Sequence, residues 1–266
     1  MTGPNCRIKS YKGGRPIDLK GQFMISIIIP LFNERDNVVQ YPTDLFPVMD
    51  RIALEYNETF EYLMVDDGSR DDTVERLNEI AGQRGDVIVL RHEKNSGMGT
   101  AIRTGIAKAK GDLIVTMDSD LTFRPQDVQV LIEAYRKTGA DCVSGSPYLR
   151  KGLMGEVTPL RLLMSRSVNF LYRLLLGGNI SCVSPIFRLY KRRIFDEIPV
   201  TSNNFEINAE IISKLLIAKM NVVEVPVPLL KRRHGSSKIR ITKEIRNYLW
   251  LLYRIFRTKY LHQEWV

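Results

Sequence analysis

Short apolar runs alternate with amphipathic segments along most of the chain. The runs are rich in Ile, Val and Leu, which is typical of strands buried in a sheet. They predict strands at 24–30, 62–65, 87–90, 113–116, 141–144 and 222–227. Apolar positions at helical spacing predict helices from about 36 and at 73–83, 101–110, 125–137, 160–176, 206–219 and 242–261. Strands that alternate with helices imply crossover connections, so we expect an α/β fold with a Rossmann-like, mostly parallel sheet, helices on both faces and C-terminal amphipathic helices.

Polar pairs follow three of the predicted strands. Asp118 and Asp120 come after strand 113–116, while Asn33–Glu34 and Asp66–Asp67 follow the first two strands. Ligands of parallel sheets bind at the carboxyl ends of the strands, which share one edge. Neighbouring carboxylates repel unless a positive group lies beside them, and Mg²⁺ or Mn²⁺ suits such oxygen ligands. A lone Asp-X-Asp pair is better explained as a solvated strand end that caps the next helix, but three acidic strand ends at one edge favour a metal site.

Composition and charge limit the cellular compartment and the classes of partner that the sequence predicts. Three scattered cysteines and no apolar run near the roughly 20 residues of a spanning helix favour a reducing compartment and a chain that does not cross a membrane. The formal net charge is +9. Most of the excess positive charge lies between Val227 and Val266, a segment that contains ten Lys and Arg residues and only two acidic residues. Such a segment can meet phosphates, nucleic acid or an anionic membrane. The aromatic residues of the last helix lie at helical spacing, which favours a packed face, so we expect no nucleic-acid partner.

Four motifs, in order, resemble the GT-A family 2 glycosyltransferases. They are IIIPLFNE at 27–34, VDDGS at 65–69, NSGMGTAIRTG at 95–105 and MDSD at 117–120. Two further elements resemble the polyprenyl-phosphate sugar synthase subgroup, whose best-known members make dolichyl phosphate mannose. These are Arg161 within PLRLLMS at 159–165 and the RRHGSSK segment at 232–238. The resemblance divides the chain into a loose extension (1–23), a GT-A catalytic domain (24–240) and a basic amphipathic helix (241–266).

The resemblance also implies a set of site residues. Asp118 and Asp120 would bind Mg²⁺ or Mn²⁺, and with Arg161 they form the expected catalytic set. Arg161, Arg232 and Lys238 would bind the phosphates of donor and acceptor. The nucleotide would contact Pro30, Phe32, Glu34, Val65, Asp67, Gly97, Asp118 and Ser119.

The implied reaction is an inverting, metal-dependent transfer of a hexose from GDP-mannose or UDP-glucose to a polyprenyl phosphate. An acceptor phosphate is already ionised, so no general base is required, whereas the leaving diphosphate needs the metal. Such an enzyme is expected to be cytoplasmic and peripheral on the membrane, with helices 160–176 and 242–261 at the interface. Core packing is the competing interpretation of these helices.

The sequence departs from the subgroup at four positions. Thr122, Pro147, Ser181 and Pro185 stand where the subgroup carries Gln, Arg, Asp and Gly. These changes leave open a hydroxyl acceptor, as in polysaccharide or glycolipid synthesis. That chemistry needs a base, for which Glu206 and Glu210 are the candidates.

Overall fold

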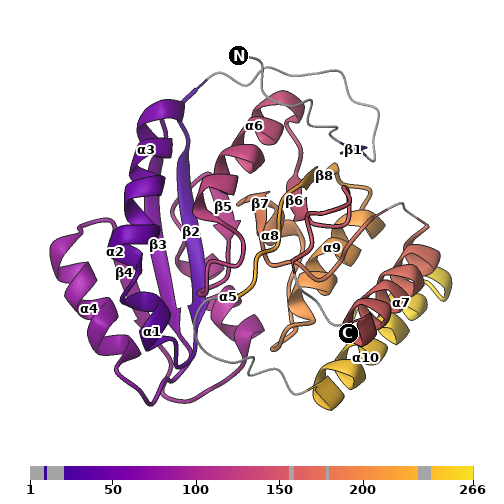
Figure 1. Ribbon diagram of the computed structural model, residues 1–266. Helices are drawn as coiled ribbons and strands as arrows, with labels where there is room; N and C mark the ends of the chain where they lie inside the picture. The colour runs from indigo at the N-terminus through magenta and orange to yellow at the C-terminus, as the bar shows by residue number, and fades with distance from the viewer. Residues whose placement is uncertain (1–8, 11–20, 156–158, 178–179, 233–240, 266) are drawn as a thin grey trace.

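Eight strands in the described part of the chain form one sheet in the order β1-β8-β6-β7-β5-β2-β3-β4 (Figure 1). This computed structural model describes residues 9–10, 21–155, 159–177, 180–232 and 241–265. The strands are β1 (Lys9–Ser10), β2 (Met24–Leu31), β3 (Thr59–Asp66), β4 (Val87–Arg91), β5 (Leu113–Thr116), β6 (Cys142–Ser146), β7 (Arg188–Lys191) and β8 (Val222–Pro226). The strands β5, β2, β3 and β4 are parallel to one another, and so are β6 and β8. The expected α/β fold with a mostly parallel sheet is confirmed.

Helices cover both faces of the sheet. In the first half these are α1 (Arg35–Val38), α2 (Tyr41–Asp44), α3 (Phe46–Tyr56), α4 (Thr73–Gln83), α5 (Met98–Lys108), the 3-10 turn η1 (Pro125–Asp127) and α6 (Val128–Thr138). The predicted helix from about 36 is broken into three, because Pro42 and Pro47 lack the amide that would continue a helix and instead stand in the first turns of α2 and α3. The helices α3, α4 and α6 bury their apolar sides on one face, and α5 lies on the other.

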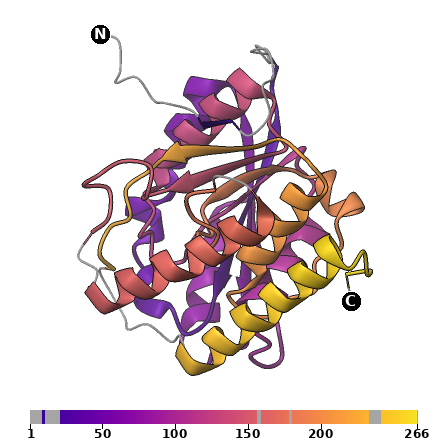
Figure 2. The same ribbon diagram turned by 90° about the vertical axis from the view of Figure 1, so that its right-hand side faces the viewer.

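The second half adds α7 (Pro159–Leu176), α8 (Ile194–Glu197), α9 (Ile207–Ile217) and α10 (Ile241–Tyr260). The helix α9 covers the same face as α5, and α7 and α10 lie side by side outside it (Figure 2). The predicted apolar face of α10 therefore divides. Ile255 and Leu252 pack into the core, whereas Leu249 and Phe256 are exposed.

The strand β7 is the main element that the hydrophobic pattern does not predict. It runs antiparallel between β5 and β6 and so joins the two halves of the sheet. Its first residue, Arg188, is fully buried, which breaks the apolar run that would have marked a strand. The guanidinium donates from Nε to Ser144 Oγ (3.1 Å), from Nη1 to the Asn208 carbonyl (2.5 Å) and from Nη2 to the Val183 carbonyl (2.7 Å). These bonds offset the cost of burying the charge.

We predict that Arg188→Met destabilises the protein by about 3 kcal/mol, because three buried acceptors lose their donor. Urea unfolding followed by circular dichroism measures the change. Arg76→Met on the exposed side of α4 is the matched control and should shift the free energy of unfolding by less than about 0.5 kcal/mol. Equal stability of the two variants would contradict this account of β7.

Candidate active site

The turn that carries Asp118, Ser119 and Asp120 follows β5 at the carboxyl edge of the sheet. Asp120 is buried, and Asp118 is half-buried. The buried Tyr41 donates its hydroxyl to the Ser119 carbonyl (2.8 Å), and the Thr122 amide donates to Asp120 Oδ1 (3.0 Å). Leu121 has a φ of 52°, a left-handed conformation that is uncommon for a branched residue. The protein thus fixes the Asp120 carboxylate in a strained turn, which is a common feature of binding sites.

The electrostatics of this turn favour a cation. Burial, and then the neighbouring Asp120 carboxylate, raise the pKa of Asp118 to about 8, and Arg232 acts in the opposite direction. Arg232 Nε lies 2.6 Å from Asp120 Oδ2, so the predicted phosphate-binding arginine and the predicted metal ligand form an ion pair. Nothing in the sequence indicates this contact, because the two residues are far apart in the chain.

Two carboxylates provide only part of a metal's coordination shell. Among the described residues, no group of three or more His, Cys, Asp and Glu side chains could hold a metal ion. The Asp118–Asp120 pair fits Mg²⁺ or Mn²⁺ in a site where a bound diphosphate and water supply the other oxygens, as is usual for nucleotide-bound Mg²⁺.

The ends of β2 and β3 bring the predicted nucleotide residues together. Pro30 and Val65 are register partners in the two strands, and Phe32 follows β2 directly. Glu34 is buried and accepts a hydrogen bond from Asn37 Nδ2 (2.5 Å). These residues lie at the same edge as the aspartate pair, which is where ligands of such sheets bind.

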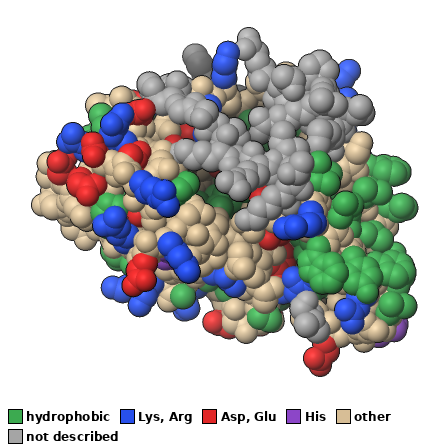
Figure 3. All heavy atoms as spheres, turned by 90° about the horizontal axis from the view of Figure 1, so that it is seen from below, with side chains coloured by type: hydrophobic (Ala, Val, Ile, Leu, Met, Phe, Trp, Pro, Cys, Tyr) green, Lys and Arg blue, Asp and Glu red, His purple; other side chains and the backbone are tan. Residues whose placement is uncertain are grey.

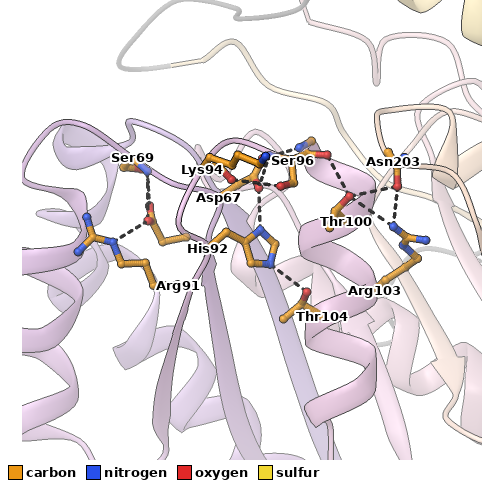
Figure 4. A network of polar contacts seen from close by, with 12 residues as sticks. Asp67, Ser69, Arg91, His92, Lys94, Ser96, Thr100, Arg103, Thr104 and Asn203 are labelled. Atoms are coloured by element: carbon orange, nitrogen blue, oxygen red, sulfur yellow. Dashed lines mark hydrogen bonds and ion pairs between the residues drawn. The ribbon is translucent and has the colours of Figure 1, made fainter.

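Asp67, which is predicted to contact the nucleotide, holds the loop before α5 (Figure 4). Its carboxylate accepts the amides of Ser96 (2.9 Å) and Gly97 (2.7 Å), and His92 Nδ1 lies 2.7 Å from its Oδ1. The neighbouring Asp66 accepts the Ser69 amide (3.1 Å) in the same way. The two aspartates therefore shape the loops on either side of the expected base site.

The glycines before and within α5 make room for another part of the chain. The amides of Gly99 and Thr100 donate to the Asn203 carbonyl, at 2.8 and 3.2 Å. A Cβ at Gly97 would lie 2.2 Å from that carbonyl oxygen, and the φ of Gly97 is 98°. Residues 202–204 thus occupy the space at the start of α5 in which the small-residue loop could have accommodated a ligand. Sequence reasoning missed this contact, since the Gly-X-Gly spacing indicates a close approach but not what approaches.

Two of the predicted phosphate ligands cannot be placed. Lys238 lies outside the described residues, and the structure describes the helix α7 at Arg161 but not the Arg161 side chain. Both remain predictions.

The candidate bases of the hydroxyl-acceptor alternative are both engaged. Glu210 is fully buried; it accepts the Ser202 amide (2.7 Å) and pairs with Lys214 (2.8 Å). Burial raises the pKa of Glu210, but bonds from Lys214 and Ser202 outweigh it, so the pKa lies below its usual value. Glu206 accepts bonds from the Asn204 amide (3.3 Å) and from Asn247 Nδ2 (3.2 Å). A low pKa and committed oxygens make Glu210 a structural residue.

The described helices include none with the length and hydropathy to span a bilayer. The model of glycosyl transferase family 2 matches residues 26–199, which contain the strand ends and the aspartate turn. The chain belongs to glycosyl transferase family 2.

Two curated relatives extend the comparison beyond the family match. The family 2 chain is 32% identical over 235 residues to a dolichol-phosphate mannosyltransferase of Pyrococcus furiosus, covering 88% of this chain and 64% of the relative. It is 28% identical to an undecaprenyl-phosphate 4-deoxy-4-formamido-L-arabinose transferase of Edwardsiella ictaluri, covering 86% of this chain and 66% of that one. The chain thus spans just under two thirds of the length of these relatives.

Solved structures confirm the GT-A fold. Glucosyl-3-phosphoglycerate synthase of Mycobacterium tuberculosis, in complex with Mn²⁺, UDP and its product, aligns with a TM-score of 0.64 at 18% identity, covering 89% of this chain and 80% of that one. The same enzyme with Mg²⁺ and UDP aligns with a TM-score of 0.63. In these two structures that enzyme binds a divalent metal together with UDP.

We predict that Mn²⁺ binding strengthens as the pH rises from about 6 to 8, because a metal requires the ionised form of Asp118 and so releases its proton. Below the pKa, the affinity should fall about tenfold for each pH unit. Electron paramagnetic resonance of free Mn²⁺, with saturating nucleoside diphosphate, measures it. Asp118→Asn should bind more weakly and lose this pH dependence.

The raised pKa of Asp118 also predicts how the stability of the metal-free protein changes with pH. A carboxyl that holds its proton more tightly when folded makes the metal-free protein less stable as the pH rises from the ordinary value towards 8. Wild-type Mn²⁺ affinity that stays constant across this range would contradict the assignment of Asp118.

Proposed function

We propose that this protein transfers a hexose, mannose or glucose, from a nucleotide sugar to a polyprenyl phosphate with inversion. The observation that carries the proposal is the ion pair between Asp120 and Arg232. It brings Arg232, the first residue of the basic RRHGSSK segment, to the aspartate pair. Negative charge that suits a metal and positive charge that suits phosphates therefore lie together at one edge of the sheet. The two curated relatives, a dolichol-phosphate and an undecaprenyl-phosphate transferase, support the same acceptor class.

The roles of the residues follow from charge. Asp118 and Asp120 would hold Mg²⁺ or Mn²⁺, which supplies Lewis-acid stabilisation to the leaving diphosphate when bound. The strand ends around Pro30, Glu34 and Asp67 orient the nucleotide. Arg232, with Arg161 and Lys238, would hold the phosphates of donor and acceptor close together against their mutual repulsion, as guanidinium groups do bidentately.

The reaction needs no proton acceptor in this arrangement. An oxygen of the ionised acceptor phosphate attacks the anomeric carbon, and the bond to the nucleoside diphosphate breaks on the opposite face, which inverts the configuration. The buried, hydrogen-bonded state of Glu210 favours this acceptor over a hydroxyl.

Peripheral contact with a membrane, on its cytoplasmic side, is the second part of the proposal. Large apolar side chains of α7 and α10 are exposed together: Phe170, Leu171, Leu174, Ile245, Leu249, Trp250, Tyr253 and Phe256. They form a continuous patch, here called the α7–α10 patch, visible at the right of Figure 3. That view is from the side on which β2 ends, so the patch and the carboxyl edge share one side of the molecule. Patches of this kind, with basic residues around them, mark membrane or protein contacts.

We predict that Asp120→Asn lowers hexose transfer to a polyprenyl phosphate by about 100-fold or more, because it removes charge stabilisation at the leaving group. Product formation from radiolabelled GDP-mannose and UDP-glucose measures it. Asp36→Asn, an exposed aspartate on α1, is the control and should remain near wild type. If no nucleotide sugar stabilises the wild type against heat in a Mn²⁺-dependent manner, the proposed activity is wrong.

Glu206→Gln separates the two acceptor classes. Transfer should persist in this variant, since a phosphate acceptor uses no base. A loss as large as that of Asp120→Asn would favour the hydroxyl acceptor instead.

We predict that Leu249→Ser combined with Trp250→Ser weakens binding to phosphatidylglycerol vesicles at least about tenfold, because two apolar side chains no longer enter the interface. Vesicle co-sedimentation measures the change. Leu54→Ser removes an equally apolar and more exposed side chain from α3, outside the α7–α10 patch, and should bind normally. Equal effects of the two sets, or no vesicle binding by the wild type, would remove the membrane proposal.

A further inference from the structure

A cavity of about 320 Å³ opens beside α7, away from the nucleotide residues. Its lining comes from the loop after β6, from α7 and from the loop before β7: Tyr148, Arg166, Asn169, Arg173 and Ser181. None of these residues belongs to the set assigned above to the nucleotide, metal or reacting phosphates.

The cavity is cationic. Arg166 and Arg173 are seven residues apart on α7, which places both guanidinium groups on one face of the helix, two turns apart. The lining contains no carboxylate. Among the described residues, no ion pair joins either arginine to an acid. Both side chains are exposed, and two like charges lining one cavity without a carboxylate counter-ion favour the binding of an anion there.

The polar wall behind the arginines is fixed in place. Asn169 is buried; its Oδ1 accepts the Val183 amide (3.1 Å), and its Nδ2 donates to Cys182 Sγ (3.6 Å). Ser181 donates its amide (2.8 Å) and its hydroxyl (2.7 Å) to Glu224, a fully buried residue of β8 that lies outside the cavity lining. The Tyr148 hydroxyl donates to Ser165 Oγ (2.7 Å). These hydrogen bonds hold the polar wall of the cavity in place before a ligand binds.

The cavity adjoins the α7–α10 patch. Phe170 and Leu174 lie between and just beyond the two arginines in sequence, and they are 57% and 66% exposed. At 100° per residue, their side chains form the next stripe around the helix, beside the arginines. The guanidinium groups thus mark the boundary between an apolar surface and a polar cavity, where the phosphate of a lipid would lie.

The cavity is also separate from the aspartate turn. Ser181 contacts Ser146 at the end of β6 (2.6 Å between the hydroxyl oxygens), whereas Asp118 follows β5, and β7 runs between these strands. Two strand spacings amount to roughly 10 Å. A phosphate in the cavity would thus lie beside the aspartate turn and not within it.

We propose that this cavity binds the phosphate of a membrane lipid, whose chains lie against Phe170 and Leu174. The inference rests on the proposed membrane contact, and it adds to that contact a specific headgroup site. Arg166 and Arg173 hold the phosphate oxygens, and Tyr148, Asn169 and Ser181 form the floor. The site fixes how the carboxyl edge faces the bilayer, which a general apolar patch does not.

Calorimetric titration of the full chain with dihexanoyl phosphatidic acid, a soluble short-chain lipid, tests the proposal without metal or nucleotide. Arg166→Ala and Arg173→Ala should each weaken binding about tenfold, the effect of losing a charge-assisted pair. Arg246→Ala is the matched control, because it removes the same charge from an exposed position on α10. It should change the affinity less than about twofold, as for a screened surface charge.

Three results would overturn the proposal. These are cavity variants that bind like the folded wild type, a control variant that loses as much affinity, or inorganic phosphate that binds as tightly as the lipid. Geranyl phosphate, titrated in the same way, identifies the source: tighter binding than phosphatidic acid, lost in the same two variants, assigns the site to an isoprenoid lipid. Asp120→Asn should keep its lipid binding while losing transfer, so a failure of the proposed reaction is distinguishable from a failure of this site.

Discussion

The close approach of two carboxylates at the end of β5 is the constraint on which the rest of the site depends. Asp118 and Asp120 share one turn, and the Asp120 carboxylate raises the energy of the ionised form of Asp118. The fold tolerates the pair because Arg232 reaches Asp120 from the segment after β8. The basic second half of the chain thus supplies positive charge to the pair before any ligand arrives.

Buried hydrogen bonds hold the loops around this edge. Asp67 fixes the loop before α5, Glu210 fixes the turn at 201–202, and Arg188 ties β6 and α9 to the centre of the sheet. Each group would be costly to bury alone, and each is satisfied by backbone or side-chain partners from another segment. The site is thus built from distant pieces of sequence whose relative positions depend on these few contacts.

The sequence predicts those parts of the fold that have a local cause. The apolar runs locate β2, β4, β5, β6 and β8 closely, and the helical spacing predicts α4 at 73–83, where the structure has it. It misses β7, since a buried Arg188 opens the strand, and it misses the contact of Asn203 with α5, since no local pattern encodes a carbonyl partner. The carboxyl edge with its acidic residues follows from topology, whereas the pairing of Asp120 with Arg232 depends on tertiary structure alone.

The Asn203 carbonyl at the start of α5 has a consequence for how a product could leave. Backbone amides at the start of a helix often bind phosphate. In this protein, the amides of Gly99 and Thr100 donate to the Asn203 carbonyl instead. In the proposed reaction, the diphosphate would be held by a dissociable cation and by side chains such as Arg232, and not by fixed amides. The departing nucleotide would then take its counter-charge with it, and Arg232 could return to Asp120 as the site empties. Release of the product would then leave the hydrogen bonds between Asn203 and α5 in place.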